Sequence, residues 1–209
     1  MSRGVPTIFV VDDEPSVRKA LTRLLTSAGY PVQAFDSASL FLQHLPHQGL
    51  GCLVLDLRMP DLNGLELQQT LASSHSTLPI IFISGHGDIP SSVRAMKAGA
   101  VDFLQKPFSD TDLLAAIDSA LQKCRRELKQ RLEIAETKSR LSTLTPRESQ
   151  VLAGVIAGKL NKQIAADLGT VEKTVKVHRS RVMQKMQVRS VAELVRLAER
   201  AGVQAADSH

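Results

Sequence analysis

Large aromatic residues and cysteines are scarce in this sequence. Its 209 residues contain no Trp, one Tyr and two Cys, whereas 43% are hydrophobic. The core must therefore be aliphatic in character, and the chain has enough apolar material for a sizeable one. Cys52 and Cys124 match neither a metal-binding spacing nor a disulfide framework, which favours a reducing cytoplasm.

Long apolar runs are also missing. No segment approaches the roughly 18 apolar residues that a membrane-spanning helix needs. The apolar stretch "TIFVV" near the N-terminus is too short for a signal peptide and is followed by acidic residues. We therefore expect a cytoplasmic protein without a membrane partner.

Charge is divided unevenly along the chain. Residues 1–120 carry 8 Lys and Arg against 12 Asp and Glu, a net charge of −4. Residues 121–209 carry 18 against 9, a net charge of +9. This asymmetry indicates two modules and favours a polyanion as the partner of the second.

Apolar runs alternate with amphipathic segments between residues 7 and 108. This alternation is typical of a parallel sheet covered by helices on both faces. The fold class predicted is α/β, with five parallel strands in the doubly wound order 2-1-3-4-5, followed by a helical linker and an all-α helix-turn-helix domain. The expected strands are 7–13, 31–35, 52–56, 79–85 and 101–107, and the expected helices are 15–29, 37–45, 64–74 and 91–100.

One long helix is predicted from residue 110 to about residue 140. Its first part can pack on the sheet, whereas the part beyond Leu121 is strongly charged. Leu121, Leu128 and Leu132 lie near heptad spacing, which would allow pairing with a partner chain. Charged residues interrupt this apolar seam, so a solvated connector is the preferred interpretation.

Five polar residues end or follow the predicted strands, namely Asp12, Asp13, Asp56, Ser84 and Lys106. In the order 2-1-3-4-5 they meet at one edge of the sheet. Three neighbouring carboxylates repel one another and need a cation, and oxygen ligands in a small cleft suit Mg²⁺. One carboxylate can then attack phosphorus and form an acyl phosphate. A lone Asp after a strand is usually a turn residue or a helix cap, but that explanation is poor for all five positions together.

The segments "FVVDDE", "VLDLRMPDLNG", "ISGHGD" and "DFLQKPF" resemble the motifs of two-component receiver domains, in the right order. The resemblance implies Asp56 as the phosphoacceptor. It implies a metal site formed by Asp12, Asp13, Asp56 and the backbone carbonyl of Arg58. In this family the position of Arg58 also tunes the lifetime of the acyl phosphate.

The same resemblance implies switch roles for Ser84, Lys106 and Phe103, and a cis peptide bond between Lys106 and Pro107. Ser84 stands where Thr is commoner, a change that keeps the hydroxyl group. His86 lies at a second position that tunes the acyl-phosphate lifetime, although an ordinary loop histidine explains it equally well.

Residues 144–203 have the sequence signals of a helix-turn-helix. Thr145 and Glu148 form a predicted capping box at the start of the first helix. Asn161 is predicted to cap a short second helix. A third helix is predicted over residues 172–186.

At about 100° per residue, that third helix has two different faces. The apolar face carries Val171, Val175, His178, Val182 and Met186. The opposite face carries Lys173, Lys176, Val177, Ser180 and Gln184, flanked by Arg179 and Arg181. A solvated basic face is the plain alternative. The preceding short helix and the basic charge favour a helix that lies in the major groove of double-stranded DNA.

The motifs "LTPRE", "NKQIA" and "TVKVH" resemble the LuxR-type helix-turn-helix of FixJ/NarL-class response regulators. The resemblance implies base-edge contacts from Lys176 and Val177, and DNA-backbone contacts from Lys162, Thr174 and Arg179. The sequence departs from the family pattern at Thr170, Val171 and Ser180, which leaves the operator sequence open.

Together these features predict a transcriptional regulator, not an enzyme. Its predicted parts are a receiver domain at 5–120, a helical linker at 121–143 and a DNA-binding domain at 144–203. A sensor histidine kinase would phosphorylate Asp56, and phosphorylation would drive homodimerisation and DNA binding. RNA polymerase is a further expected partner. The residues expected at the dimer contact are Val93, Met96 and Lys97.

Three other functions are alternatives. They are a phosphatase or receiver-gated hydrolase, a constitutive DNA-binding protein with a degenerate receiver, and a small-molecule-sensing regulator. Residues 144–209 lack a second catalytic constellation, which argues against the first. The complete set of acidic residues argues against the second. Residues 1–120 show no sequence signal of an apolar ligand cavity, which argues against the third.

Overall fold

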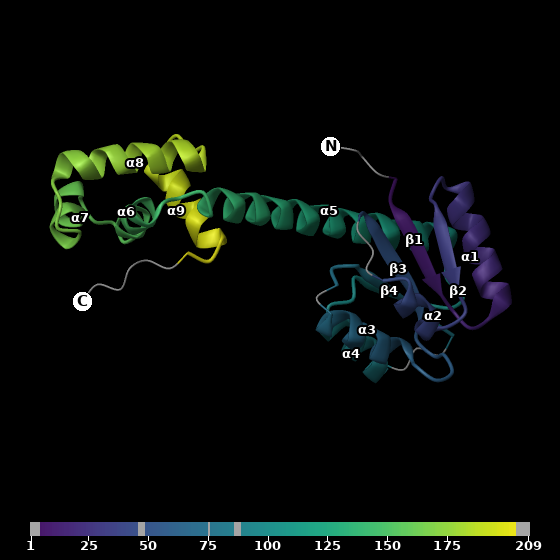
Figure 1. Cartoon of the computed structure of the whole chain (residues 1–209). Coiled ribbons are helices and arrows are strands. Elements are labelled where there is room, and N and C mark those ends of the chain that lie inside the picture. Colours follow the sequence, from purple (N-terminus) through teal and green to yellow (C-terminus); the bar gives the residue numbers. More distant parts are fainter. Residues whose placement is uncertain (1–4, 46–48, 75, 86–88, 204–209) are drawn as a thin grey trace. The chain divides into compact units, whose positions relative to one another are not determined.

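The computed structural model describes residues 5–45, 49–74, 76–85 and 89–203. The chain divides into two compact units, Met1–Leu128 and Lys129–His209, which we call the N-terminal and C-terminal units. Figure 1 labels most of their helices and strands. Within the described ranges, none of the helices has both the length and the apolar content needed to cross a lipid bilayer.

A five-stranded parallel sheet forms the centre of the N-terminal unit. Its strand order is β2-β1-β3-β4-β5, as predicted. Every residue of β3 and β4 is buried, which explains their nearly continuous apolar sequences. The strands are β1 (Thr7–Val11), β2 (Val32–Phe35), β3 (Gly51–Asp56), β4 (Ile80–Ser84) and β5 (Asp102–Gln105).

Helices cover both faces of this sheet. On one face, α1 (Pro15–Ser27) and the first turns of α5 (Asp110–Leu141) bury Leu21, Leu113 and Ile117 against the strands. α5 is one continuous helix, as the sequence predicts, and its later turns belong to the C-terminal unit.

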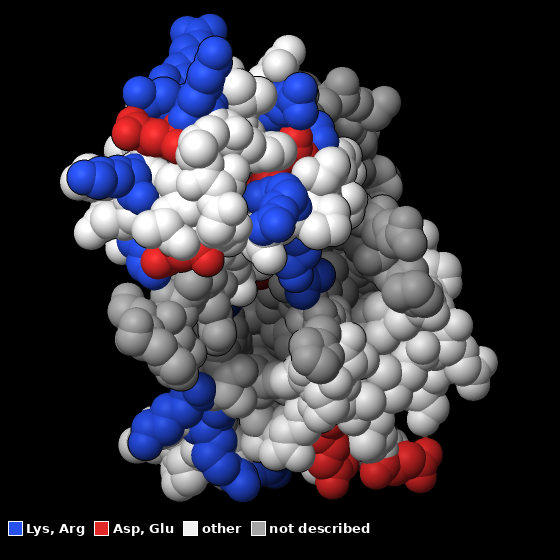
Figure 2. Space-filling model, turned by 60° about the vertical axis from the view of Figure 1, so that its left-hand side comes forward, with Lys and Arg blue, Asp and Glu red and all other residues white. Residues whose placement is uncertain are grey.

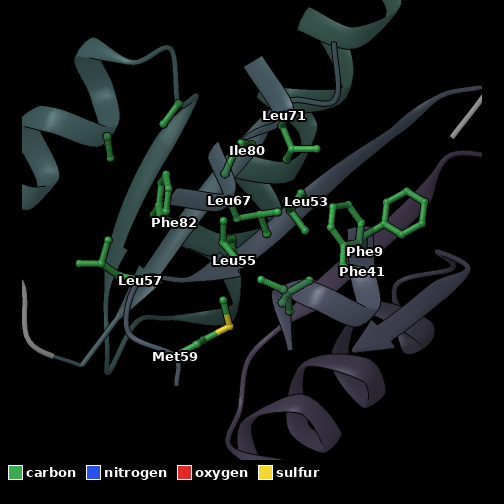
Figure 3. Close-up of a cluster of buried hydrophobic side chains, with 14 residues drawn as sticks. Phe9, Phe41, Leu53, Leu55, Leu57, Met59, Leu67, Leu71, Ile80 and Phe82 are labelled. Carbon is green, nitrogen blue, oxygen red and sulfur yellow. The ribbon is translucent and has the colours of Figure 1, made fainter. Parts of the chain in front are cut away.

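On the other face, α2 (Ala38–Gln43), α3 (Gly64–Ser73) and α4 (Ile89–Lys97) cover the sheet. Figure 3 shows how the rings of Phe9 and Phe41 lie beside aliphatic side chains of this cluster. The two rings meet edge to face, with their centroids 5.6 Å apart. Phenylalanines therefore contribute to a core that is otherwise mainly aliphatic.

The bounds of α4 differ from those predicted. The helix begins at Ile89, two residues before the predicted start, because Pro90 is well suited to the first turn of a helix. It ends at Lys97, because Gly99 follows in the left-handed region at φ +94° and reverses the chain.

In the described part of the C-terminal unit, four helices follow α5 and form a hydrophobic core. They are α6 (Pro146–Ile156), α7 (Asn161–Asp167), α8 (Glu172–Met186) and α9 (Val191–Arg200). Val151, Val175, Val182 and Leu194 are among the buried side chains of this core. The apolar face predicted for residues 172–186 is therefore the inner face of α8.

Two local predictions in this unit are wrong. Asn161 is the first residue of α7 and not its cap, because the Leu160 backbone N–H donates to Gln163 Oε1 at 2.7 Å and closes the turn one residue earlier. Val171, placed on the apolar face by periodicity, is 65% exposed. It precedes α8 in an extended conformation, so the helical periodicity does not govern its direction.

The predicted capping box of α6 is confirmed, and its buried carboxylate also forms an ion pair with a partly exposed lysine. Thr145 Oγ1 accepts from the Glu148 backbone N–H, and the Thr145 backbone N–H donates to Glu148 Oε2 at 2.8 Å. Lys185 Nζ of α8 lies 2.7 Å from the same carboxylate. Hydrogen bonds from Lys185 and from the Thr145 backbone lower the pKa of the Glu148 carboxyl to about 2.

Removing this charge should weaken the C-terminal unit in a pH-dependent way. Since the carboxyl has a lowered pKa in the folded state, its stabilisation is present above pH 4.5 and is lost as the pH falls towards 2. We expect Glu148→Gln to lower the melting temperature at pH 7 and to have a shrinking effect between pH 4.5 and 2. Glu199→Gln, at an exposed position of α9, should have no such effect in the same calorimetric scans.

Gly64 allows α3 to begin close to the end of β3. A methyl group at this position would lie 2.5 Å from the Asp56 backbone oxygen and 2.9 Å from Phe82 Cε1. We expect Gly64→Ala to reduce the free energy of unfolding of the N-terminal unit by about 1–3 kcal/mol, measured by urea denaturation. Gly85→Ala is the matched control, because a methyl group there meets nothing within 4 Å. Equal losses in both variants would contradict the steric argument.

Candidate functional site

Three acidic residues converge at the carboxyl edge of the sheet. β1 and β3 are parallel neighbours with Val11 opposite Leu55, so the next residues, Asp12 and Asp56, come side by side. Carboxylate oxygens of Asp12, Asp13 and Asp56 lie within 4.8 Å of one another. Asp12 is fully buried and Asp56 is 8% exposed, whereas Asp13 faces solvent. The arrangement is consistent with a site for a divalent cation, whose oxygen ligands would come from these side chains.

Lys106 follows β5 and reaches into this acidic cluster. Its Nζ atom lies 2.7 Å from Asp12 Oδ2 and 3.7 Å from Asp56 Oδ1. Its backbone N–H donates to the Ser84 carbonyl at 2.8 Å, which holds the start of the β5–α5 loop to the end of β4. The lysine therefore compensates part of the negative charge of the acidic cluster.

The carboxyl group of Asp56 is electrostatically perturbed. Burial raises its pKa to about 6, and the neighbouring charges of Asp12 and Asp13 raise it as well. Lys106 and a hydrogen bond from the Leu57 backbone N–H act in the opposite direction. At pH 7 the group is mostly ionised, so it is available as a nucleophile, but its charge is poorly compensated.

The other predicted receiver residues lie around this cluster. Ser84 is the last residue of β4 and is buried, one position beyond the pairing of Ile83 with Asp56. Phe103 in β5 is half-buried, and its ring stacks on Phe82 with centroids 6.3 Å apart. The peptide bond between Lys106 and Pro107 is cis, as the resemblance implied. Arg58 is exposed in the loop after β3, and His86 lies outside the described residues.

Sequence reasoning missed two groups that hold Asp12. The Glu14 backbone N–H donates to Asp12 Oδ1 at 2.8 Å, and Arg18 Nη1 donates to the Asp12 carbonyl at 2.7 Å. The segment "DDEPSVR" contains both residues, and the helix start at Pro15 was the available signal. A helix that begins directly after the acidic pair turns its first N–H groups and its first basic residue back towards that pair.

In the C-terminal unit, most residues predicted to bind DNA are exposed. Thr174 and Arg179 are half-buried, and Arg179 Nη1 donates to Asn161 Oδ1 at 2.8 Å, which connects α8 to α7. Lys176 Nζ lies 3.0 Å from Glu172 Oε1 on the outer face. The exposed members of the predicted set are Lys162, Lys173, Lys176, Val177, Ser180 and Arg181.

Figure 2 shows Lys and Arg side chains interspersed with fewer Asp and Glu on the face turned to the viewer. Val177 is 45% exposed, although it is apolar. The outer side of α8 therefore combines cations with an exposed apolar group, a combination that suits phosphate and base-edge contacts.

The residues predicted to form a dimer contact lie together on α4. Val93 and Met96 are each 44% exposed, and Lys97 is also exposed. These three side chains of the N-terminal unit are therefore accessible to a partner chain.

Comparison with known families identifies both units. A model described as "Response regulator receiver domain" matches residues 8–118, more than half of the chain. A model described as "Bacterial regulatory proteins, luxR family" matches residues 142–198. The chain belongs to the two-component response regulators, with a LuxR-type DNA-binding domain.

Individual response regulators resemble the chain over nearly its whole length. Nodulation protein W of Bradyrhizobium diazoefficiens is 49% identical, covering 95% of this chain and 87% of that protein. The transcriptional regulatory protein FixJ of the same organism is 46% identical, covering 94% and 96% respectively. A solved structure of the response regulator StyR is 52% identical, with a TM-score of 0.82, and covers 94% of this chain and 100% of that one. A receiver domain implies a histidine kinase as partner, and a LuxR-type domain implies DNA binding.

The raised pKa of Asp56 should affect the stability of this response regulator when no metal is bound. A raised pKa means that ionisation of Asp56 costs stability, and this cost develops as the pH rises from about 4 to about 6. In EDTA at pH 7, Asp56→Asn should therefore raise the free energy of unfolding, by on the order of 1–3 kcal/mol. The gain should vanish below pH 4 in denaturant titrations.

Asp61→Asn is the matched control, because Asp61 is exposed and its left-handed backbone, at φ +65°, also accepts Asn. A similar gain in this variant, or a gain of Asp56→Asn that persists at pH 3, would contradict the electrostatic cause.

Proposed function

We propose that this response regulator is a cytoplasmic, phosphorylation-dependent transcription factor in which a sensor histidine kinase transfers a phosphoryl group to Asp56. The observation that carries the proposal is the position of the Asp56 carboxylate beside Asp12, Asp13 and Lys106 at the carboxyl edge of the sheet. In this environment the ionised carboxylate is a nucleophile whose own charge is poorly compensated.

The residues present fit a magnesium ion. Their donors are hard carboxylate oxygens within 4.8 Å of one another, and the backbone carbonyl of Arg58 is a further proposed ligand. Asp12, Asp13 and Asp56 would hold the ion. When bound, it would neutralise part of the charge that the carboxylates and a phosphoryl group bring together.

The chain's own residues would carry the transfer. An oxygen of the Asp56 carboxylate forms a bond to phosphorus while the bond from phosphorus to the kinase histidine nitrogen breaks, and that nitrogen takes up a proton from solvent as the neutral imidazole leaves. Lys106 can move from Asp12 towards the new phosphoryl oxygens, since its ammonium group is already 3.7 Å from Asp56 Oδ1. The hydroxyl of Ser84, one position beyond the residue paired with Asp56, would donate to another oxygen.

Movement of Ser84 towards the phosphoryl group would let Phe103 turn inward from its position against Phe82. This would remodel the surface of α4 and favour a homodimer contact through Val93, Met96 and Lys97. A dimer presents two copies of α8 to paired half-sites in double-stranded DNA. RNA polymerase bound nearby is a further proposed partner.

In each copy, Lys176 and Val177 would contact base edges. The residues proposed to contact the DNA backbone or flank the base-reading side chains are Lys162, Lys173, Thr174, Arg179, Ser180 and Arg181. This division of roles predicts that substitutions at the first two positions alter sequence preference, whereas those at the flanking cations weaken binding to all sequences.

Coupling of phosphorylation to DNA binding is testable by mobility shift. The DNA would be a duplex selected from a random pool by protein treated with acetyl phosphate and Mg²⁺. We expect treatment to raise the affinity of the wild type at least about tenfold, within the usual range of allosteric coupling. Asp56→Asn should show no increase, whereas Asp61→Asn should respond like the wild type. Equal affinity of the treated and untreated wild type would contradict the proposed switch.

A further inference from the structure

The C-terminal end of α8 is tied to the last turn of α5. The final carbonyl groups of a helix have no partner within the helix, and they carry partial negative charge. At the end of α8, the Met186 carbonyl accepts a hydrogen bond from Arg140 Nη1 at 3.0 Å. A guanidinium group is well suited to this position, because it combines a fixed positive charge with donors in a rigid plane.

The guanidinium group of Arg140 is itself held in place. Its Nη2 atom donates to Glu136 Oε1, one turn earlier in α5, at 2.6 Å. The side chain is only 22% exposed. One planar group therefore joins a carboxylate of α5 to the last turn of α8, with little freedom to reorient.

A second cation joins the same parts of the chain, but this one belongs to α8 and donates to groups beyond the end of α5. Lys185 Nζ donates to the Thr143 carbonyl at 2.9 Å, just beyond the end of α5, and to Glu148 Oε2 of α6. The last turn of α8 is thus connected to the α5–α6 junction by one side chain from each element.

The later turns of α5 also contact α9. Thr137 is buried, and Arg200 Nη1 lies 3.9 Å from Glu133 Oε2. Residues 129–141 belong to the C-terminal unit, and a rotation of this part of α5 would act on the end of α8 through Arg140.

A small tilt of α8 at this end displaces the residues near its other end by a larger distance. Lys176 lies ten residues before Met186, which corresponds to about 15 Å along a helix. A tilt of roughly 10° at the C-terminal end would displace Lys176 by about 2.5 Å. That displacement is close to the whole length of a hydrogen bond, so contacts to base edges would be lost. Long, flexible cations that bind phosphates anywhere along the DNA backbone tolerate it better.

We propose that Arg140 is a positioning residue for sequence-specific DNA recognition, which acts by fixing the C-terminal end of α8 relative to α5. This inference rests on the proposed function of α8 as the helix that reads DNA. Arg140 does not itself contact DNA in this proposal. Its loss therefore reduces discrimination between sequences and leaves the general attraction to DNA intact.

The test compares full-length wild type with Arg140→Ala, Arg140→Gln and Lys138→Ala. Gln retains a donor that can reach a carbonyl, and Lys138 is an exposed cation two residues away on α5. Affinity is measured by fluorescence anisotropy over a series of salt concentrations. All proteins are treated with acetyl phosphate and Mg²⁺. The two probes are a duplex selected by the treated wild type from a random pool and a 30-base-pair duplex of scrambled sequence.

We expect Arg140→Ala to bind the selected duplex about tenfold more weakly and the scrambled duplex as well as the wild type does. Arg140→Gln should recover part of the lost affinity, and Lys138→Ala should behave like the wild type. All variants should show the same dependence of affinity on salt, because no phosphate contact is removed.

Other outcomes would overturn the proposal. Unchanged affinity of Arg140→Ala for the selected duplex would show that the tie does not position α8. An equal loss on both duplexes with a shallower salt dependence would make Arg140 a phosphate contact. Circular dichroism melting detects an unfolded C-terminal unit, in which case Arg140→Gln decides between these outcomes. A wild type that selects no sequence from the pool even after treatment with acetyl phosphate and Mg²⁺ would instead refute the proposed function.

Discussion

The N-terminal unit keeps the carboxylates of Asp12 and Asp56 away from water and beside each other, and this arrangement costs free energy. Parallel pairing of β1 with β3 imposes it, because adjacent strands end at the same edge of the sheet. Burial raises the pKa of Asp56 to about 6, and Lys106, which lies closer to Asp12 than to Asp56, offsets only part of this rise. A divalent cation or a phosphoryl group at this edge therefore changes the balance of charge, and loops that follow neighbouring strands can respond to the change.

Much of this unit could be predicted because apolar runs alternate with amphipathic segments along its sequence. Buried strands have nearly continuous apolar sequences, so the strands and the sheet order follow from the chain, and with them the meeting of Asp12, Asp56 and Lys106. The limits of single elements are less predictable. α4 begins at Ile89 and ends before Gly99, since a proline and a left-handed glycine override the apolar pattern that suggested residues 91–100.

Contacts from side chains to distant backbone groups could not be predicted. Arg140 and Met186 are 46 positions apart, and neither periodicity nor a motif marks the hydrogen bond between them. The errors at Asn161 and Val171 have another cause, because both residues lie at the start of a helix, where periodicity does not fix the first helical residue. Asn161 is a common capping residue, but here its side chain accepts from Arg179 while the backbone of Leu160 closes the turn. The hydrogen bond between Asn161 and Arg179 depends on how α7 and α8 pack, which the sequence alone does not specify.

Acceptance of a phosphoryl group by the carboxylate of Asp56 is the step on which the proposed regulation depends. Its most direct test is the intact mass of the full-length protein after incubation with Mg²⁺ and acetyl phosphate, followed by borohydride reduction to locate the acyl phosphate. Phosphorylation of Asp56 predicts one added phosphoryl group on the wild type, located at Asp56, and none on Asp56→Asn. A wild type that gains no mass, or an Asp56→Asn variant that gains the same mass, would contradict it.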